Sequence, residues 1–293
     1  MWRQITFSVD ESCADALSDD LTELGALSVS FDDDGDQPLF EPGPGETPLW
    51  HRTRVTGLFE PDVNPETVFL ALAARYPGDV LNARTVTELE DQIWERAWLE
   101  HFKPMRFGSR LWVCPGGFEP PEPDAVNILL DPGLAFGTGT HPTTALCLEW
   151  LEGQNLVDKT VMDYGCGSGI LAVAALKLGA AQAYAVDIDP QALTATTDNA
   201  LKNCVEDRLT CALPRTLSLS EADIVVANIL AGPLAALADD LIKCLPMGGL
   251  LALSGILATQ AETVISAYQP RIHFEPPVQR EDWVLLAGVR VAD

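Results

Sequence analysis

Three glycines alternate with other residues in the segment 163–169, whose sequence is DYGCGSG. The segment follows a predicted strand and opens a predicted helix, which is the context that a nucleotide-binding glycine loop requires. Glycine lets a ligand approach the backbone without meeting a Cβ, so Gly165 and Gly167 are candidate ligand contacts. A dinucleotide fingerprint needs its third glycine at position 170, which is Ile170 here. The spacing therefore argues against a dinucleotide as the ligand. A simple strand-to-helix turn without a ligand is the alternative to a ligand-binding loop.

A carboxylate ends the next predicted strand, 183–187. Asp187 follows Gly165 by 22 residues, and a carboxylate at that point can accept hydrogen bonds from both hydroxyls of a ribose. Asp189 is a rival, but it precedes Pro190, and this pair is typical of a helix N-cap with proline at the first helical position. We assign ribose binding to Asp187 and helix capping to Asp189.

The glycine loop, with Asp163 at its strand end, resembles the first motif of class I S-adenosylmethionine-dependent methyltransferases. In that class, many enzymes that act on planar amino or amide groups carry Asn/Asp-Pro-Pro-aromatic after the fourth strand, where the ring stacks on the acceptor. This chain has Asn228 after the predicted strand 223–227 and continues with Ile-Leu-Ala. Loss of the ring favours a flexible aliphatic amine and makes Asn228 the candidate catalytic residue; a plain turn residue is the alternative.

A long run of turn residues, 130–144, leads into a helix that is predicted to begin near Pro142. Its backbone amides and hydroxyl groups, with Gly139 and Thr144 among them, are suited to hold the carboxylate of a methionine moiety at a helix N-terminus. His141 is a possible general base. Its place directly before Pro142 suits a helix cap better, and we favour that role.

These residues need a sheet to bring them together, and the second part of the chain predicts one. Strands and helices alternate from residue 160, which indicates a parallel sheet flanked by helices. Two last strands, 271–275 and 282–291, lack a helix between them and are expected to close the sheet as an antiparallel edge. The other predicted elements are strands 106–114, 126–130, 160–163, 183–187, 208–212, 223–227 and 249–254, and helices 168–178, 190–202, 232–245 and 258–268.

The first part of the chain predicts a β-α-β-β-α-β order, which is the ferredoxin-like arrangement. The predicted strands are 2–9, 27–31, 53–59 and 80–86, and the predicted helices are 12–24 and 65–76. A polar helix over 88–102 with Trp94 and Trp98 on one face is expected to connect the two parts. The predicted architecture is a ferredoxin-like α+β domain (1–87), a connecting helix or linker (88–104) and a Rossmann-like α/β methyltransferase domain (105–293).

The net charge of −25 is unevenly distributed. Residues 1–100 hold 21 acidic and 6 basic side chains, a net of −15, and residues 101–293 hold 22 and 12, a net of −10. Such a field repels phosphate backbones and attracts cationic partners, so we expect a basic protein partner and no direct nucleic-acid site. An acidic surface that only gives solubility is the alternative.

Seven cysteines form no C-x-x-C pair, which favours free thiols over disulfides or a metal site. A run of about 18 apolar residues is absent, so no membrane segment is expected. The start of the chain does not read as a secretory signal, and we expect a cytoplasmic monomer.

Together, four segments closely resemble the bacterial methyltransferase family that modifies protein eleven of the large ribosomal subunit. The acidic front domain, the two connector tryptophans and the total length match as well. The resemblance implies S-adenosylmethionine as the cofactor, a front domain that holds the substrate, and multiple methylation of lysine side chains and the N-terminal α-amine. The segments are residues 130–144, 163–169, 186–189 and 227–233.

By position, the resemblance implies cofactor contacts for Thr144, Gly165, Asp187 and Asn228. We add Asp163, Gly167 and Gly139 as candidate binding residues, with no metal. The predicted partners are the basic ribosomal protein and the assembling large subunit. Three rivals remain: a glutamine- or adenine-directed methyltransferase, a nicotinamide-dependent oxidoreductase, and a non-enzymatic ribosome-assembly factor.

Overall fold

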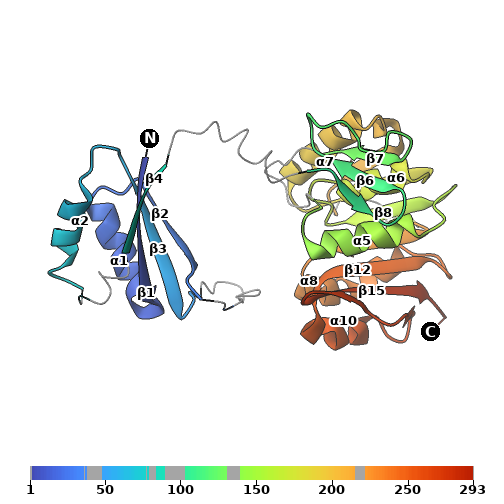
Figure 1. Ribbon diagram of the computed structural model, residues 1–293. Helices are drawn as coiled ribbons and strands as arrows, with labels where there is room; N and C mark the ends of the chain where they lie inside the picture. The colour runs from blue at the N-terminus through green and yellow to red at the C-terminus, as the bar shows by residue number, and fades with distance from the viewer. Residues whose placement is uncertain are drawn as a thin grey trace. The chain divides into compact units, whose positions relative to one another are not determined.

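The computed structural model describes residues 2–35, 37, 48–76, 78, 84–89, 103–130, 139–214 and 222–292. The chain forms two compact units, residues 1–97 and 98–293 (Figure 1). Each unit has a hydrophobic core of its own.

Among its described residues, the front unit has a four-stranded antiparallel sheet and the helices α1 and α2, as the sequence predicts (Figure 1). The strand order is β2-β3-β1-β4, and the chain order is β-α-β-β-α-β, so the ferredoxin-like prediction is confirmed. The elements are β1 (Trp2–Asp10), α1 (Glu11–Glu23), β2 (Ser28–Asp33), β3 (Arg52–Phe59), α2 (Pro65–Leu72) and β4 (Arg84–Leu89).

Alternation of side chains builds the core of this unit. Ile5 and Phe7 of β1 and Val55 of β3 are fully buried, because alternate residues of a strand point to the same face. They pack with Leu17 and Leu21 of α1 in one cluster. Gln4, Thr6 and Ser8 of β1 lie on the opposite face and are partly exposed, which is the usual pattern for an antiparallel sheet with one solvated side.

The last strand of the front unit differs from its prediction. β4 covers Arg84–Leu89, whereas the sequence predicts a strand over 80–86 and a helix from residue 88. Residues 88 and 89 therefore belong to the sheet. The two connector tryptophans, Trp94 and Trp98, lie outside the described residues.

The second unit contains an eight-stranded sheet that is parallel in its centre. The order is β10-β9-β8-β11-β12-β15-β13, with β14 paired to β15, and β15 runs antiparallel to β12, as expected for the closing edge. The strands are β8 (Thr160–Tyr164), β9 (Gln182–Val186), β10 (Leu209–Ala212), β11 (Ile224–Asn228), β12 (Leu250–Leu257), β13 (Ile272–Phe274), β14 (Val278–Arg280) and β15 (Trp283–Arg290).

Two helical layers cover this sheet. Ile224 and Val226 of β11 pack into one hydrophobic cluster and Val225 and Ala227 into another, so the strand is buried on both faces. Near-continuous apolar strands are typical of such double-sided sheets. The helices on the first side are α5 (Pro142–Glu152), α6 (Ile170–Lys177) and α7 (Pro190–Lys202), and those on the second side are α8 (Ala231–Ala236), α9 (Ala238–Lys243) and α10 (Ala261–Tyr268).

Two predicted elements of this unit are divided in the structure. The strand predicted over 106–114 is a hairpin of β5 (Met105–Phe107) and β6 (Leu111–Cys114), because the chain turns at Gly108 with φ +62°. The helix predicted over 232–245 is interrupted at Leu237, where ψ is 4°. β5 and β6 join β7 (Val126–Leu129) in a three-stranded sheet.

Within the described residues, none of the helices is long and apolar enough to cross a membrane. All seven cysteines are free thiols; four of them are buried, whereas Cys204 is exposed and Cys13 and Cys211 are partly exposed. The described part of the chain also gathers no group of three or more His, Cys, Asp or Glu side chains that would hold a metal ion.

Candidate active site at the carboxyl ends of three strands

The candidate residues meet where the order of the parallel strands changes direction. From β8 the chain proceeds outward to β9 and β10, and it then returns to β11 on the other side of β8. Ligands of open α/β sheets bind outside the carboxyl ends of the strands at such a switch point. Asp163, Asp187 and Asn228 stand at or directly after these ends in β8, β9 and β11.

The glycine loop between β8 and α6 needs its glycines for backbone conformation. Gly165, Gly167 and Gly169 have φ of +79°, +53° and +76°, the left-handed region that disfavours residues with a Cβ. A Cβ at Gly169 would also lie 2.5 Å from Cγ2 of Thr196. The loop is therefore a tight turn whose backbone conformation and close packing favour glycine.

Polar contacts from helix α7 fix this loop. The Thr196 hydroxyl donates to the Gly167 carbonyl at 3.0 Å, and Asn199 Nδ2 donates to the Ser168 carbonyl at 2.9 Å. Both side chains are buried. Sequence reasoning does not predict either residue, because both occur in the middle of a helix and no local pattern marks their approach to a loop about 30 residues earlier.

Asp187 connects the glycine loop to the end of β9. Its Oδ2 accepts the Gly167 N–H at 2.9 Å, and its Oδ1 accepts the Asp189 N–H at 3.0 Å. An ionised carboxylate offers about four acceptor positions, so the two oxygens can still receive hydroxyl groups. Asp189 caps α7 through the Gln191 N–H at 2.8 Å, with Pro190 at the first position, as the sequence predicts.

Asp163 lies beneath the loop and is 1% exposed. Its Oδ2 accepts the Ala172 N–H at 3.0 Å, whereas Oδ1 is buried without a hydrogen-bond partner among the described residues. Burial raises the pKa of this carboxyl to about 7, and the Asp187 carboxylate adds to the shift against the lowering effect of the Ala172 N–H. A buried polar atom of this kind is a place where a ligand or its bound water can provide the missing partner.

Asn228 at the end of β11 contacts the start of helix α5. Its Nδ2 donates to Oγ1 of Thr144 at 3.2 Å, and Thr144 is 2% exposed. In the described part of the chain this is the hydrogen bond of the Asn228 side chain, which leaves Oδ1 able to accept another. The contact joins two predicted site residues that are 84 positions apart.

Comparisons with known proteins identify the family of the chain. The family model described as "Ribosomal protein L11 methyltransferase (PrmA)" matches residues 1–291. The chain belongs to this family. It is 58% identical to the ribosomal protein L11 methyltransferase of Methylococcus capsulatus over 291 residues, covering 99% of both chains. It is 55% identical to that of Pseudomonas aeruginosa over 293 residues, covering 100% of this chain and 99% of the relative.

A solved structure also resembles the chain. The crystal structure of the ribosomal protein L11 methylase from Lactobacillus delbrueckii subsp. bulgaricus has a TM-score of 0.58 at 35% identity, and it covers 65% of this chain and 100% of that one. The fold is therefore that of a class I methyltransferase, and the chain is an S-adenosylmethionine-dependent enzyme.

The residues of this methyltransferase fit S-adenosylmethionine. The left-handed glycines form a tight turn that carries no side chains, and Asp187 stands beside it with acceptor positions for a ribose. The buried Asp163 carboxyl, whose Oδ1 has no hydrogen-bond partner among the described residues, precedes the loop in β8. Together these residues offer acceptors for hydroxyl groups and an open backbone for a nucleoside, with no cluster of positive charge for a diphosphate among the contacts described.

His141 has the capping role that the sequence favours. Its Nδ1 accepts the Thr143 N–H at 3.4 Å and lies 2.7 Å from Oγ1 of the same residue. The ring also stands edge-on to Trp283 at 4.9 Å between centroids. Nδ1 is thus occupied by the start of α5, which argues against a general base at this nitrogen.

Gly139 lies close to the start of α6. It is buried with φ +88°, and a Cβ there would lie 3.5 Å from Cδ1 of Ile170, the first residue of that helix. This places Gly139 next to the glycine loop. The neighbouring residues 131–138 of the predicted segment lie outside the described residues.

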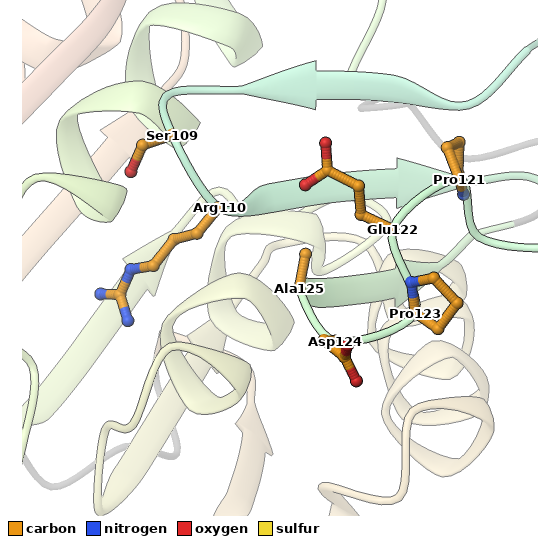
Figure 2. A pocket seen from close by; sticks show the side chains of 7 residues that line it. All are labelled: Ser109, Arg110, Pro121, Glu122, Pro123, Asp124 and Ala125. Atoms are coloured by element: carbon orange, nitrogen blue, oxygen red, sulfur yellow. The ribbon is translucent and has the colours of Figure 1, made fainter.

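A hollow elsewhere on the unit contains none of the predicted site residues. It has a volume of about 520 Å³ and lies among the turns of the three-stranded sheet (Figure 2). Arg110 and Glu122 stand on its sides, and both belong to exposed loops. We therefore locate the active site at the strand ends and not in this hollow. The lining residues are Ser109, Arg110, Pro121, Glu122, Pro123, Asp124 and Ala125.

Proposed function

We propose that this chain transfers methyl groups from S-adenosylmethionine to lysine side chains and to the N-terminal α-amine of ribosomal protein L11. The observation that carries the proposal is Asn228, which stands beside the glycine loop, bonded to Thr144 through Nδ2 and with Oδ1 available. The residues after it, Ile229 and Leu230, provide no aromatic ring for a planar acceptor. Membership of the L11 methyltransferase family supports the substrate.

The cofactor-binding residues of the proposal lie along the strand ends. Asp187 would accept the ribose hydroxyls, Gly165 and Gly167 would line the nucleoside with bare backbone, and Asp163 would support the loop from below. Thr144 and Asn228 would border the methionine part of the cofactor, and Gly139 would contribute backbone near the start of α6. When bound, S-adenosylmethionine supplies an electrophilic methyl group on a sulfonium.

The acceptor amine has to be neutral before it can attack that methyl group. A lysine with a pKa near 10.4 is mostly protonated at pH 7, which costs roughly 4.6 kcal/mol at about 1.36 kcal/mol per unit. Desolvation in a closed site lowers the pKa of an amine and offsets part of this cost. Water can then take the proton, and no strong base is needed. This agrees with His141 serving as a helix cap.

Asn228 performs the positioning step in this account. Its Oδ1 or its backbone carbonyl accepts an N–H of the acceptor amine and directs the nitrogen lone pair at the methyl group. Positioning of two reactants contributes up to about 7–11 kcal/mol in favourable cases. The bond from Nδ2 to Thr144 determines which way Oδ1 points, so Thr144 orients the catalytic amide.

The front unit completes the proposal as the part that holds the substrate. We assign residues 1–87 to substrate recognition, 88–104 to the connection and 105–293 to methyl transfer. The charge of −15 on residues 1–100 would attract a basic ribosomal protein. We further propose that the enzyme acts as a monomer in the cytoplasm, on L11 before or during assembly of the large subunit.

The test uses the purified chain, labelled S-adenosylmethionine and the dissociated proteins of a large ribosomal subunit. The intact mass of each protein is measured before and after incubation. We expect mass gains in steps of one methylene group on L11 and on no other protein. Methyl transfer to a different protein would contradict the substrate, and cofactor binding without any transfer would contradict the enzymatic role.

A further inference from the structure

A bulge in strand β12 stands next to the catalytic asparagine. Asn228 pairs with Ser254 at the end of β11. Directly after this pair, the register of β12 against β15 shifts from Leu253 opposite Leu286 to Ile256 opposite Val284. Two residues, Ser254 and Gly255, therefore face one residue of β15, which defines a β-bulge. Bulges are frequent next to active sites, where they redirect the chain.

Gly255 in this bulge lies against the peptide that follows the catalytic residue. A Cβ on Gly255 would be in severe contact with the carbonyl oxygen of Ile229, and 2.8 Å from its carbonyl carbon. Real Cβ atoms essentially never come within 3.0 Å of a heavy atom that does not belong to the same residue or its two chain neighbours. Since the atoms in the way are backbone, they cannot rotate aside like the end of a side chain. Any side chain at position 255 must therefore displace the Ile229 peptide.

The side chain of Ile229 meets the glycine loop. A Cβ on Gly165 would be in severe contact with Cγ2 of Ile229. Gly165 and Gly255 both have left-handed backbones, with φ of +79° and +84°. Ile229 is thus held between two glycines, one from the cofactor loop after β8 and one from the bulge in β12.

The bulge itself is held in place. Ser254 is fully buried, and its hydroxyl donates to the Val284 carbonyl at 3.0 Å across the bulge. On the β11 side, the Asn228 side chain is bonded to Thr144. The Ile229 peptide therefore occupies a fixed position between two anchored segments.

We propose that Gly255 is a positioning residue for methyl transfer. By leaving room for the Ile229 peptide, it sets where Asn228 and the neighbouring carbonyl stand relative to the glycine loop. The inference rests on the proposed role of Asn228. A displacement of the order of 1 Å near reacting groups can lower a rate by about a hundredfold. A side chain at position 255 that displaces the Ile229 peptide should therefore lower kcat.

The experiment compares Gly255→Ala with Gly248→Ala as a matched control. Gly248 has φ +78°, and a Cβ there would meet nothing within 4 Å. Both variants place alanine in the left-handed region, and only Gly255→Ala pushes on Ile229. At saturating L11 and S-adenosylmethionine, we expect kcat to fall about a hundredfold in Gly255→Ala and to stay within about threefold of wild type in Gly248→Ala. The Kd for the cofactor should change less than kcat.

A second pair of variants keeps the test decisive if Gly255→Ala does not fold. Ile229 and Ile265 are both partly buried against the same hydrophobic cluster. Ile229→Ala should lower kcat about tenfold, because the peptide loses its support against Gly165, whereas Ile265→Ala should lower the melting temperature and keep kcat. Ile229→Val retains Cγ2 and should keep kcat near that of wild type.

Equal kcat values for the Gly255 and Gly248 variants would overturn the inference. If Gly255→Ala does not fold, equal kcat values for Ile229→Ala and Ile265→Ala would overturn it. A wild-type enzyme that binds S-adenosylmethionine but transfers no methyl group would refute the proposed function and, with it, the positioning role. The wild-type measurement therefore separates the two failures.

Discussion

The loops that leave β8 and β11 stand at the same edge of the sheet but are held in different ways. The glycine loop is fixed by polar contacts, since Asp187, Thr196 and Asn199 each bond to its backbone. The loop after β11 has one described side-chain bond, from Asn228 to Thr144, and is otherwise fixed by the packing of Ile229 between two glycines.

This difference matches the two tasks that the proposed function gives to the loops. A loop that receives the same cofactor in every cycle gains from a rigid backbone, because a preorganised site loses less entropy on binding. A loop that meets an amine must keep acceptor atoms free, and Asn228 Oδ1 has no bond to the described residues. Packing fixes the position of such a loop without occupying its acceptors. The comparison therefore predicts that variants of the first loop change cofactor affinity and variants of the second change the rate.

Asn228→Ala should give the largest effect. The variant loses Oδ1 as an acceptor for the amine, so we expect methyl transfer at saturating S-adenosylmethionine to fall by about 100- to 1,000-fold, the range for removal of one hydrogen bond that stabilises a transition state. Cofactor affinity, measured by calorimetry, should fall by much less. A variant that transfers methyl groups at nearly the wild-type rate would show that the Asn228 side chain does not position the amine.

Asp187→Ala should give the converse result. Hydrogen bonds to a charged group contribute about 1.5–3 kcal/mol, so the Kd for S-adenosylmethionine should rise about 10- to 100-fold. The single-turnover rate at saturating cofactor should stay within about threefold of wild type, since the carboxylate does not meet the amine. If the rate falls as far as the affinity, the division between the two loops is wrong.

Thr196→Val sharpens the comparison with a smaller change. It removes the hydroxyl that donates to the Gly167 carbonyl and keeps nearly the same volume. We expect a loss of about 1 kcal/mol, or about a fivefold rise in the cofactor Kd. Thr194→Val is the control, because that hydroxyl is bonded to the Pro190 carbonyl on the exposed side of the same helix. Equal affinities for the two variants would show that the rigidity of the loop does not matter.

Asp163→Asn should change how stability depends on pH. The folded state raises the pKa of Asp163 from 3.8 to about 7, so the folded state keeps a proton that the unfolded state has released. The free energy of unfolding therefore decreases as the pH rises between about 4 and 7. Above that range, the contribution of Asp163 no longer changes with pH. Asparagine does not titrate, so the free energy of unfolding of the Asp163→Asn variant should not show this decrease.

The measurement is the melting temperature of the ligand-free protein at pH 5 and pH 8. Wild type should lose more stability over this interval than Asp163→Asn, because other groups titrate alike in both. The exposed Asp198→Asn serves as the control and should follow the wild type. An equal change in melting temperature between pH 5 and pH 8 for wild type and Asp163→Asn would contradict the raised pKa.

The sequence predicts the parts of the site that lie at strand ends. Glycines at 165, 167 and 169 and acids after apolar strands are local signals, and the observed sheet brings them together because parallel strands share one edge. The capping roles of His141 and Asp189 also agree with the sequence. In each case the signal is a residue type next to a predicted boundary.

The remaining features depend on distant segments. Thr196 and Asn199 reach a loop about 30 residues earlier, and nothing near them in the sequence shows it. Gly255 inside a strand is a weak sign of a bulge, but its partner, the Ile229 peptide, appears only in the fold. The bounds of β4 could not be predicted from the sequence. Residues 84–88 are all exposed, so the strand has no alternation of buried and exposed residues that would mark its limits.

The central claim, that the loop after β11 serves an aliphatic amine, is tested most directly by mapping the methyl groups on L11. The product of the wild-type reaction is digested, and the modified positions are located by fragment mass spectrometry. The account predicts methyl groups on lysine Nζ atoms and on the N-terminal α-amine only. Methyl groups on glutamine or asparagine amides would contradict it, because the site would then accept planar groups without an aromatic ring to hold them.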